Sequence, residues 1–265
     1  MKRKGLLSIL LVGALAFSLT ACGKKDDKTI KIGVTPVPHE EIVNEIKPLV
    51  EAKGYKLEII EFNDYVTPNT ALAEKELDAN FFQHVPYLDE TNKEKGLDLT
   101  WVAKIHIEPM GLYSKKVTKF ADIKDGANIA IPNDASNGSR ALKLLADNGL
   151  FKVKDAELIS PADITENPKN IKITELDAAQ LPRTLDDAKV DAAVINTNYA
   201  LDAGLNPVKD ALVIESKDSP YANILAVRKG DEETEKTKIL KEALTSSDVK
   251  TFIEKKYDGS IVPAF

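Results

Sequence analysis

The sequence is poor in cysteine, in aromatic residues and in clustered positive charge. Cys22 is the only cysteine among 265 residues, so no internal disulfide can stabilise the fold. Aromatic residues make up 6% of the chain, yet hydrophobic residues reach 43%, enough for one large core or two smaller ones. The formal net charge is -6 and no stretch forms a basic patch, which argues against a nucleic-acid partner.

Common motifs of hydrolytic enzymes are also missing. The chain has no G-x-S-x-G elbow, no H-E-x-x-H helix and no spare cysteine that could act as a nucleophile. An enzyme needs an activated nucleophile or a pair of tuned carboxylates. We therefore expect a protein that is not an enzyme and that uses no cofactor.

The first 21 residues have the three-part pattern of a secretory signal peptide. A basic MKRK start precedes the apolar run LLSILLVGALAF, and small residues follow in SLTAC. The apolar run is shorter than the roughly 20 residues that a transmembrane helix needs. No later stretch approaches that length, so we expect residues 1–21 to be removed and the chain after Lys28 to be water-soluble.

Leu19, Thr20, Ala21 and Cys22 resemble the lipobox of bacterial lipoproteins. In those proteins the cysteine thiol receives a diacylglyceryl group, and the cysteine becomes the first residue of the processed chain. Lipidation also accounts for a lone cysteine in an oxidising compartment, where a free thiol is a liability. We therefore expect acylated Cys22 to anchor the protein in the lipid of the cell membrane, on its extracytoplasmic face, with residues 22–28 as the tether.

After the tether, short apolar strands alternate with amphipathic helices, the pattern of an α/β protein with a largely parallel sheet. Strand-like segments include TIKIGVTP, KLEIIEF, GANIAIP, AELIS and DAAVIN, and helical segments include HEEIVNEIKPLVEAKGY and NGSRALKLLADNGL. Two such sets and the late strand YANILAVRK indicate two lobes joined by crossings near residues 113–118 and 219–224. We therefore expect lobe I to comprise residues 29–115 and 222–265, and lobe II residues 116–221.

Polar and aromatic residues are concentrated in the segments that follow the predicted strands. These segments read TPVPHE, FNDYVTP, NFFQHVPY, IPNDASNGSR and INTNYA. Any one of them alone is explained as a turn, because Asn, Asp and Pro favour turns. Open parallel sheets bind ligands beyond the carboxyl ends of their strands, so the concentration of such residues at one rim predicts a binding site.

Arg140 lies in the first turn of a predicted helix, where the helix dipole disfavours a cation. A bound anion would offset that cost, and the planar guanidinium can grip a carboxylate with two hydrogen bonds. The alternative is a solvated arginine on the helix face. Asn196, Asn198 and Asn223 each offer a donor and an acceptor, as a zwitterionic ligand requires.

Phe81 and Phe82 are neighbours in a strand, so one side chain is expected in the core and the other in the crevice. With Tyr65, His84 and Tyr87, the second ring would line an apolar slot that has hydrogen-bonding groups at its rim. Such a slot suits an uncharged side chain with a polarisable tip, since thioether sulfur packs well against aromatic edges. A lone histidine such as His84 is, however, more often structural than functional.

Three long strings carry a specific resemblance to a known family. They are DANFFQHVPYLD at 78–89, PNDASNGSRALKLL at 132–145 and VINTNYA at 194–200, and KIGVTPVPHEEI and the lipobox agree with them. Over essentially its whole length, the chain resembles the methionine-binding lipoproteins that serve ABC importers. The resemblance implies a two-lobed periplasmic-binding-protein-like fold. Each lobe would be a mixed, mostly parallel sheet flanked by helices, with the ligand in the interlobe cleft.

The same resemblance implies roles for individual residues and partners. Arg140 would hold the carboxylate of methionine, with Asn198 and Asn223 completing the polar clasp. The residues that would surround the thioether side chain are Tyr65, Phe82, His84 and Tyr87. The implied ligand is L-methionine, D-methionine or a methionine-containing peptide, and the implied partner is a membrane permease with its ATPase subunit. The binding protein itself is expected to be a monomer.

Two other functions are compatible with an exported lipoprotein. A metal-ion-binding protein would use His39, His84 and His106, which lie near predicted strand ends and would have to converge with a carboxylate. Arg140 beside such a site would repel a cation. A purely structural or adhesive surface lipoprotein would bind no small ligand at all.

Overall fold

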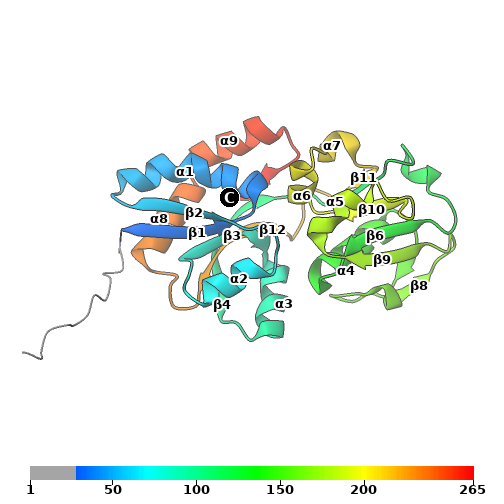
Figure 1. Cartoon of the computed structure of the whole chain (residues 1–265), viewed down its shortest axis with the longest axis horizontal. Helices are drawn as coiled ribbons and strands as arrows, with labels where there is room; N and C mark the ends of the chain where they lie inside the picture. Colours follow the sequence, from blue (N-terminus) through cyan, green and yellow to red (C-terminus); the bar gives the residue numbers. More distant parts are fainter. Residues whose placement is uncertain (1–27) are drawn as a thin grey trace, which may run out of the picture.

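The computed structural model describes residues 28–265, so the expected signal peptide and Cys22 lie outside the described residues. Figure 1 shows two lobes side by side, each built around one main sheet with helices packed against it. Within residues 28–265, no helix combines the length and the apolar character needed to cross a membrane.

Lobe I is built on a six-stranded mixed sheet. Its strands, in spatial order, are β13 (Val262–Pro263), β4 (Leu99–Ile107), β12 (Ala222–Arg228), β3 (Ala79–His84), β1 (Thr29–Val34) and β2 (Lys56–Glu61). β1 pairs in parallel with β2 and β3, whereas β12 is antiparallel to both β3 and β4. The helical elements of this lobe are η1 (Pro36–Glu40), α1 (Glu41–Ala52), α2 (Thr67–Ala73), α3 (Val85–Lys95), α8 (Glu235–Leu244) and α9 (Ser247–Tyr257).

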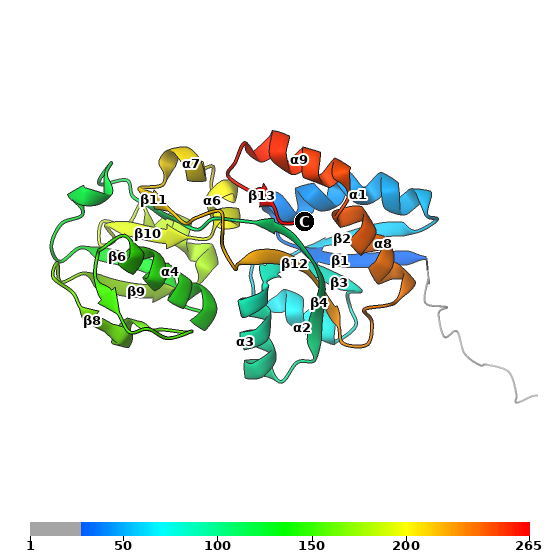
Figure 2. The same ribbon diagram turned by 180° about the vertical axis from the view of Figure 1, so that it is seen from behind.

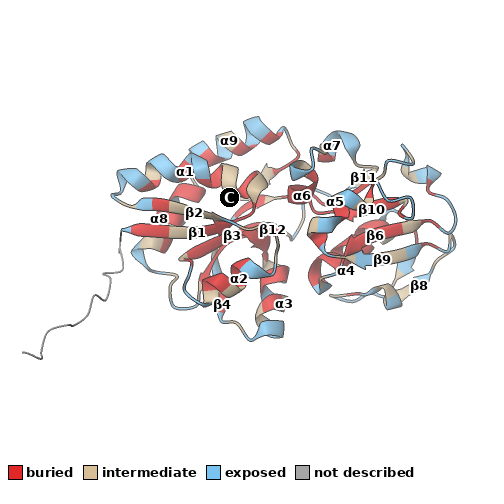
Figure 3. Ribbon diagram, in the orientation of Figure 1, coloured by how far each residue is buried: buried red, intermediate tan, exposed pale blue. Residues whose placement is uncertain are grey.

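Different helices cover the two faces of this sheet, because side chains alternate along each strand. From β12, Leu225 and Val227 join the core formed with α1, α8 and α9, whereas Ile224 and Ala226 pack with α2 and α3. All four residues are fully buried. Figure 3 shows that burial is concentrated in the central strands of this sheet. The stretch 224–227 is continuously apolar because this strand is buried on both faces, and β12 returns the chain to lobe I as expected.

Lobe II is built on a five-stranded mixed sheet. Its strands, in spatial order, are β11 (Val213–Ile214), β5 (Gly111–Tyr113), β10 (Ala192–Ile195), β6 (Asn128–Pro132) and β9 (Lys172–Leu176). β6 is parallel to β9 and β10, whereas β5 is antiparallel to β10 and β11. The remaining elements are α4 (Ala135–Asp147), α5 (Leu181–Thr184), α6 (Thr197–Asp202), α7 (Pro207–Asp210), the short turns η2 (Phe120–Asp122), η3 (Pro161–Asp163) and η4 (Ala178–Gln180), and the pair β7 (Lys152–Val153) and β8 (Ile164–Glu166).

The chain passes between the lobes twice, at residues 108–110 and at residues 215–221 (Figure 2). The first crossing lies earlier than the expected 113–118, because Gly111–Tyr113 pairs with β10 and β11 and so belongs to the sheet of lobe II. From strand pairing we take lobe I as residues 29–107 and 222–265, and lobe II as residues 111–214.

The segment AELIS, expected as a strand at 156–160, is irregular. Ile159 is buried, but its backbone N–H donates to Ser139 Oγ on α4 at 3.0 Å rather than to a neighbouring strand. The helix side chain therefore satisfies the buried backbone group that a sheet would otherwise have to satisfy.

Candidate functional site

A small cavity lies between the lobes, beyond the carboxyl ends of the parallel strands, where such sheets bind ligands. The residues that line it are Tyr65, Phe82, Gln83, His84, Tyr87, Glu108, Asn137, Arg140, Asn196, Thr197 and Asn223. Its volume is about 20 Å³, which leaves room for about one water molecule. The lobes are therefore closed on each other, and side chains of both meet across the gap.

Two junctions between a strand and a helix position the polar side chains. β3 ends at His84, whose Nδ1 caps α3 by accepting a hydrogen bond from the Tyr87 N–H at 3.3 Å. In lobe II, Asp134 caps α4 by accepting from the Asn137 N–H at 2.8 Å. Such caps satisfy backbone donors at a helix start, so local chemistry places these residues. Burial raises the pKa of the Asp134 carboxyl, but the N–H groups of Asn137 favour its ionised form.

A chain of hydrogen bonds from Asp134 sets the orientation of three side chains across the cavity. Its carboxylate also accepts from Asn137 Nδ2 at 3.1 Å, so Asn137 Oδ1 faces the other way. That oxygen is 3.2 Å from His84 Nε2 and accepts from Asn196 Nδ2 at 2.8 Å. Burial lowers the pKa of His84 to about 3, so the ring is neutral at pH 7. Its single proton is on Nε2, because Nδ1 already accepts the bond that caps α3.

Asn196 is left with an unsatisfied oxygen. Its Nδ2 is used by Asn137, and its Oδ1 is buried without a hydrogen-bond partner within residues 28–265. An orphaned buried acceptor is destabilising and rare in native proteins. Because Asn196 also lines the cavity, its oxygen is available to a donor on a ligand.

Three rings of lobe I form one wall of the cavity. The ring centroids of Tyr65, Phe82 and Tyr87 lie 5.7 to 6.0 Å from one another, in tilted or edge-on arrangements. Phe81 points to the opposite face of β3, into the core, where its ring meets His39 edge-on at 4.7 Å. The strand therefore divides the two phenylalanines between core and cavity, as its alternation predicts. Tyr199, which the sequence analysis did not single out, extends the wall from lobe II, 4.9 Å from Tyr65.

Arg140 is buried, with 3% of its surface exposed, so it is not a solvated arginine on a helix face. Arg140 does not lie in the first turn of the helix, as predicted from the sequence, because α4 starts at Ala135 and places it in the second turn, beyond the reach of the dipole. Its partner within the chain is Glu215, which accepts from Nε at 3.1 Å and from Nη2 at 2.5 Å. Nη2 also donates to the Glu108 carbonyl oxygen at 2.8 Å. For Nη1, no hydrogen-bond partner is present among residues 28–265.

Asn198 and Asn223 already make contacts in the closed structure. Asn198 Oδ1 accepts from the Tyr65 hydroxyl at 2.5 Å, which joins lobe II to lobe I, and Asn198 does not line the cavity. Asn223, on β12, lines the cavity, and its Oδ1 lies 3.1 Å from His39 Nε2. The structure therefore brings six of the seven expected residues to the cavity itself, and the seventh to its aromatic wall.

Glu108, which the sequence analysis missed, is a buried carboxylate at the first crossing. Its Oε1 lies 2.7 Å from His106 Nε2 and 3.2 Å from His39 Nε2, and its Oε2 accepts from the Asn198 N–H at 3.1 Å. Burial raises the pKa of this carboxyl, and the neighbouring His39 and Arg140 oppose that effect. In the sequence, Glu108 is the one acidic residue of the largely apolar run TWVAKIHIEPMGLYS. A buried carboxylate must be satisfied by hydrogen-bond donors, and this need was the signal that could have identified it.

The cluster of His39, His106 and Glu108 is the part of the structure that bears on metal binding. One ligand atom from each lies within 4.8 Å of the others, so two of the three predicted histidines do converge with a carboxylate. His84 does not belong to this group and bonds to Asn137 instead. Burial lowers the pKa of His39 to about 4 and that of His106 to about 3, so both rings are neutral. His106 Nε2 bonds to Glu108 and His39 Nε2 bonds to Asn223 Oδ1, so protein partners explain the cluster without a cation.

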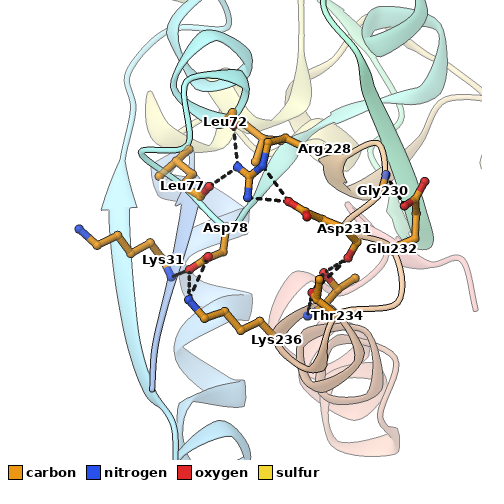
Figure 4. Close-up of polar contacts among 11 residues, drawn as sticks. Lys31, Leu72, Leu77, Asp78, Arg228, Gly230, Asp231, Glu232, Thr234 and Lys236 are labelled. Atoms are coloured by element: carbon orange, nitrogen blue, oxygen red, sulfur yellow. Dashed lines mark hydrogen bonds and ion pairs between the residues drawn. The ribbon is translucent and has the colours of Figure 1, made fainter. Parts of the chain in front are cut away.

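A larger groove of about 1090 Å³ lies on lobe I, at the amino ends of the parallel strands and away from the interlobe cavity. Figure 4 shows ion pairs and backbone contacts among charged residues that line it. Lys236 pairs with Asp78 at 3.0 Å, and Arg228 pairs with Asp231 at 2.7 Å. Arg228 Nη1 also donates to the carbonyl oxygens of Leu72 and Leu77, which ties β12 to the turn before β3. These contacts give structural roles to Asp78, Arg228, Asp231 and Lys236, and the interlobe cavity, which side chains of both lobes line, is the stronger candidate site.

Known proteins resemble this chain over nearly its whole length. Residues 30–265 match the family described as NlpA lipoprotein. The D-methionine-binding lipoprotein MetQ of Salmonella typhi is 43% identical over 257 residues, which cover 95% of this chain and 94% of that protein. A nutrient-binding protein from Burkholderia cenocepacia, solved bound to methionine, is 48% identical with a TM-score of 0.86, over 89% of this chain and 100% of that one. An ABC transporter periplasmic substrate-binding protein from Coxiella burnetii is 44% identical with a TM-score of 0.85, over the same shares.

Proposed function

The chain belongs to the NlpA lipoprotein family, and from this membership we propose that it captures methionine outside the cytoplasm and delivers it to an ABC-type importer. The observation that carries the proposal is the composition of the cavity. A buried guanidinium, an unsatisfied amide oxygen and a wall of three rings line the same enclosed space. A zwitterion with an apolar, polarisable side chain matches all three features.

Each part of methionine has a counterpart in this cavity. Arg140 Nη1 is the donor for the ligand carboxylate, and the amide oxygens of Asn196 and Asn223 are acceptors for its ammonium group. Asn198 supports the clasp through its bond to Tyr65. The thioether side chain lies against the wall of Tyr65, Phe82 and Tyr87, with the neutral ring of His84 beside it. The wall of aromatic edges favours sulfur over a polar side chain, which distinguishes methionine from glutamine.

The closed cavity is too small for an amino acid, so binding requires the lobes to separate and close again. The ligand favours closure only to the extent that it binds the closed form more tightly, and groups from both lobes provide that difference. The hinge for this opening and closing lies in the two segments that connect the lobes, residues 108–110 and 215–221. The closed, loaded form is the state that the permease with its ATPase subunit receives.

The remaining assignments complete the proposal. The protein is anchored through acylated Cys22 on the extracytoplasmic face of the membrane, acts as a monomer and catalyses no reaction. Support for the lipid anchor and for a role in transport comes from the sequence before Lys28 and from the names of the relatives, which describe lipoproteins and transport proteins.

The test is calorimetric titration of the soluble part, residues 28–265, after unfolding and refolding to remove co-purified ligand. L-Methionine, D-methionine, methionine-containing dipeptides, leucine and glutamine are titrated separately. We expect saturable binding of a methionine ligand and none of glutamine. A ligand that binds only the native state also raises the unfolding temperature, which gives an independent readout. Absence of a response to every methionine ligand would refute the proposal.

Metal binding is the second candidate function, favoured by the convergence of His39, His106 and Glu108. Zinc and manganese titrations of the same refolded protein decide between the two. Metal binding would be supported if zinc gave a heat of binding that is lost in a His106→Gln variant and methionine gave no heat of binding.

A further inference from the structure

The guanidinium of Arg140 is held from two sides by the second crossing between the lobes. Glu215, the first residue after β11, accepts from the Nε and Nη2 edge of the guanidinium. Tyr221, the last residue before β12, lies under its face, with the guanidinium carbon 4.3 Å from the ring centroid. A segment of seven residues, 215–221, thus supplies both an edge contact and a face contact to the one arginine that lines the cavity.

These contacts decide which part of Arg140 a ligand can use. Nε and Nη2 are engaged by Glu215, and Nη2 also donates to the Glu108 carbonyl oxygen. Within residues 28–265, only Nη1 of this guanidinium is left without a partner. A ligand carboxylate therefore meets Nη1, and the two-pronged grip expected from the sequence is already taken by an internal carboxylate.

Separating Arg140 from Glu215 to admit the ligand would cost free energy, because both side chains are buried or nearly so. The side chains are 3% and 16% exposed, and separating a buried pair leaves an uncompensated charge. Glu215 Oε2 also accepts a hydrogen bond from the N–H of Met110, in the first crossing, at 3.4 Å. The stacked ring of Tyr221 adds a cation–π contact and is itself packed against His84, with ring centroids 5.1 Å apart.

We propose that Glu215 and Tyr221 are positioning residues, which hold Arg140 so that Nη1 points to the carboxylate of the ligand and thereby connect ligand recognition to the segment that joins the lobes. The inference rests on the proposed function. In this proposal Glu215 supports methionine binding, so removing its charge weakens binding. If Glu215 were instead a competitor that the ligand must displace, removing its charge would strengthen binding.

The experiment compares paired variants by calorimetric titration of refolded protein with methionine and with methioninamide, which keeps the ammonium and thioether groups but has no carboxylate. Glu215→Gln is expected to raise the Kd for methionine about tenfold and to leave that for methioninamide unchanged. Tyr221→Phe keeps the ring and should bind as the wild type does, whereas Tyr221→Leu should weaken methionine binding several-fold. In an Arg140→Ala background, Glu215→Gln should have no further effect, because the residue acts through the guanidinium.

A ligand-free measurement guards against a variant that simply fails to fold. The NMR signal of the Arg140 Nε–H should be protected from solvent exchange in the wild type and in Tyr221→Phe, and lose that protection in Glu215→Gln. Unchanged or tighter methionine binding by Glu215→Gln, or equal weakening for methionine and methioninamide, would overturn the inference while leaving the proposed function intact. If the wild-type protein showed no binding of methionine, that result would overturn the proposed function and the inference with it.

Discussion

Replacing Arg140 by methionine removes the guanidinium but keeps most of the side-chain volume, so it tests the ligand assignment with little change in packing. Arg140 is the only cationic side chain among the residues that line the cavity. A charged hydrogen bond in a desolvated site is worth about 2 kcal/mol or more, so the Kd for methionine should rise about 30-fold or more. The titration described above measures this change directly.

The same substitution has a second consequence that must be measured separately. Glu215 loses its partner, and because its side chain is 16% exposed it is only partly rehydrated. We expect the free energy of unfolding, measured with urea on ligand-free protein, to fall by about 1–3 kcal/mol. Arg183→Met is the matched control, because Arg183 is exposed on α5 of the same lobe and should change neither quantity. If Arg140→Met binds methionine within twofold of the wild type, Arg140 does not hold the ligand carboxylate.

Three further predictions follow from the polar contacts of the cavity. Asn196→Ala should weaken methionine binding about tenfold but leave the affinity for 4-(methylthio)butanoate, which has no ammonium group, unchanged in the same titration; equal losses for both ligands would remove Asn196 from ammonium recognition. Glu108→Gln should lower the free energy of unfolding by about 1–3 kcal/mol in urea, since an amide has only one oxygen and cannot accept from both His106 and the Asn198 N–H, and an unchanged midpoint would contradict this. For His84, the folded pKa of about 3 lies below the ordinary 6.5, so the unfolded state binds the extra proton between these values and stability falls as the pH drops from about 6.5 toward 3. The slope should be shallower in His84→Gln by up to about 1.4 kcal/mol per pH unit, and an identical slope in urea titrations at several pH values would refute the neutral ring.

The fold could be predicted largely from local patterns. The continuous apolar run in β12 encodes burial on both faces of that strand, and the amphipathic patterns of α1 and α4 encode which face of each helix is buried. These patterns need no knowledge of the rest of the chain. Where prediction failed, a distant partner decided the outcome. Gly111–Tyr113 belongs to lobe II only because β10 and β11 pair with it, and the segment 156–160 is irregular because Ser139 satisfies its backbone.

The candidate site divides in the same way. Strand alternation and helix capping place Phe82 and His84 at the rim, so sequence alone determined which residue types meet at the cavity. Only the tertiary structure decided how they are paired, because Glu215 and Arg140 are 75 residues apart in the chain and their contact depends on how the two crossings are packed. Burial also depends on how the whole chain packs. It keeps the ring of His84 neutral, makes Glu108 dependent on its hydrogen-bond donors, and leaves one oxygen of Asn196 for a ligand.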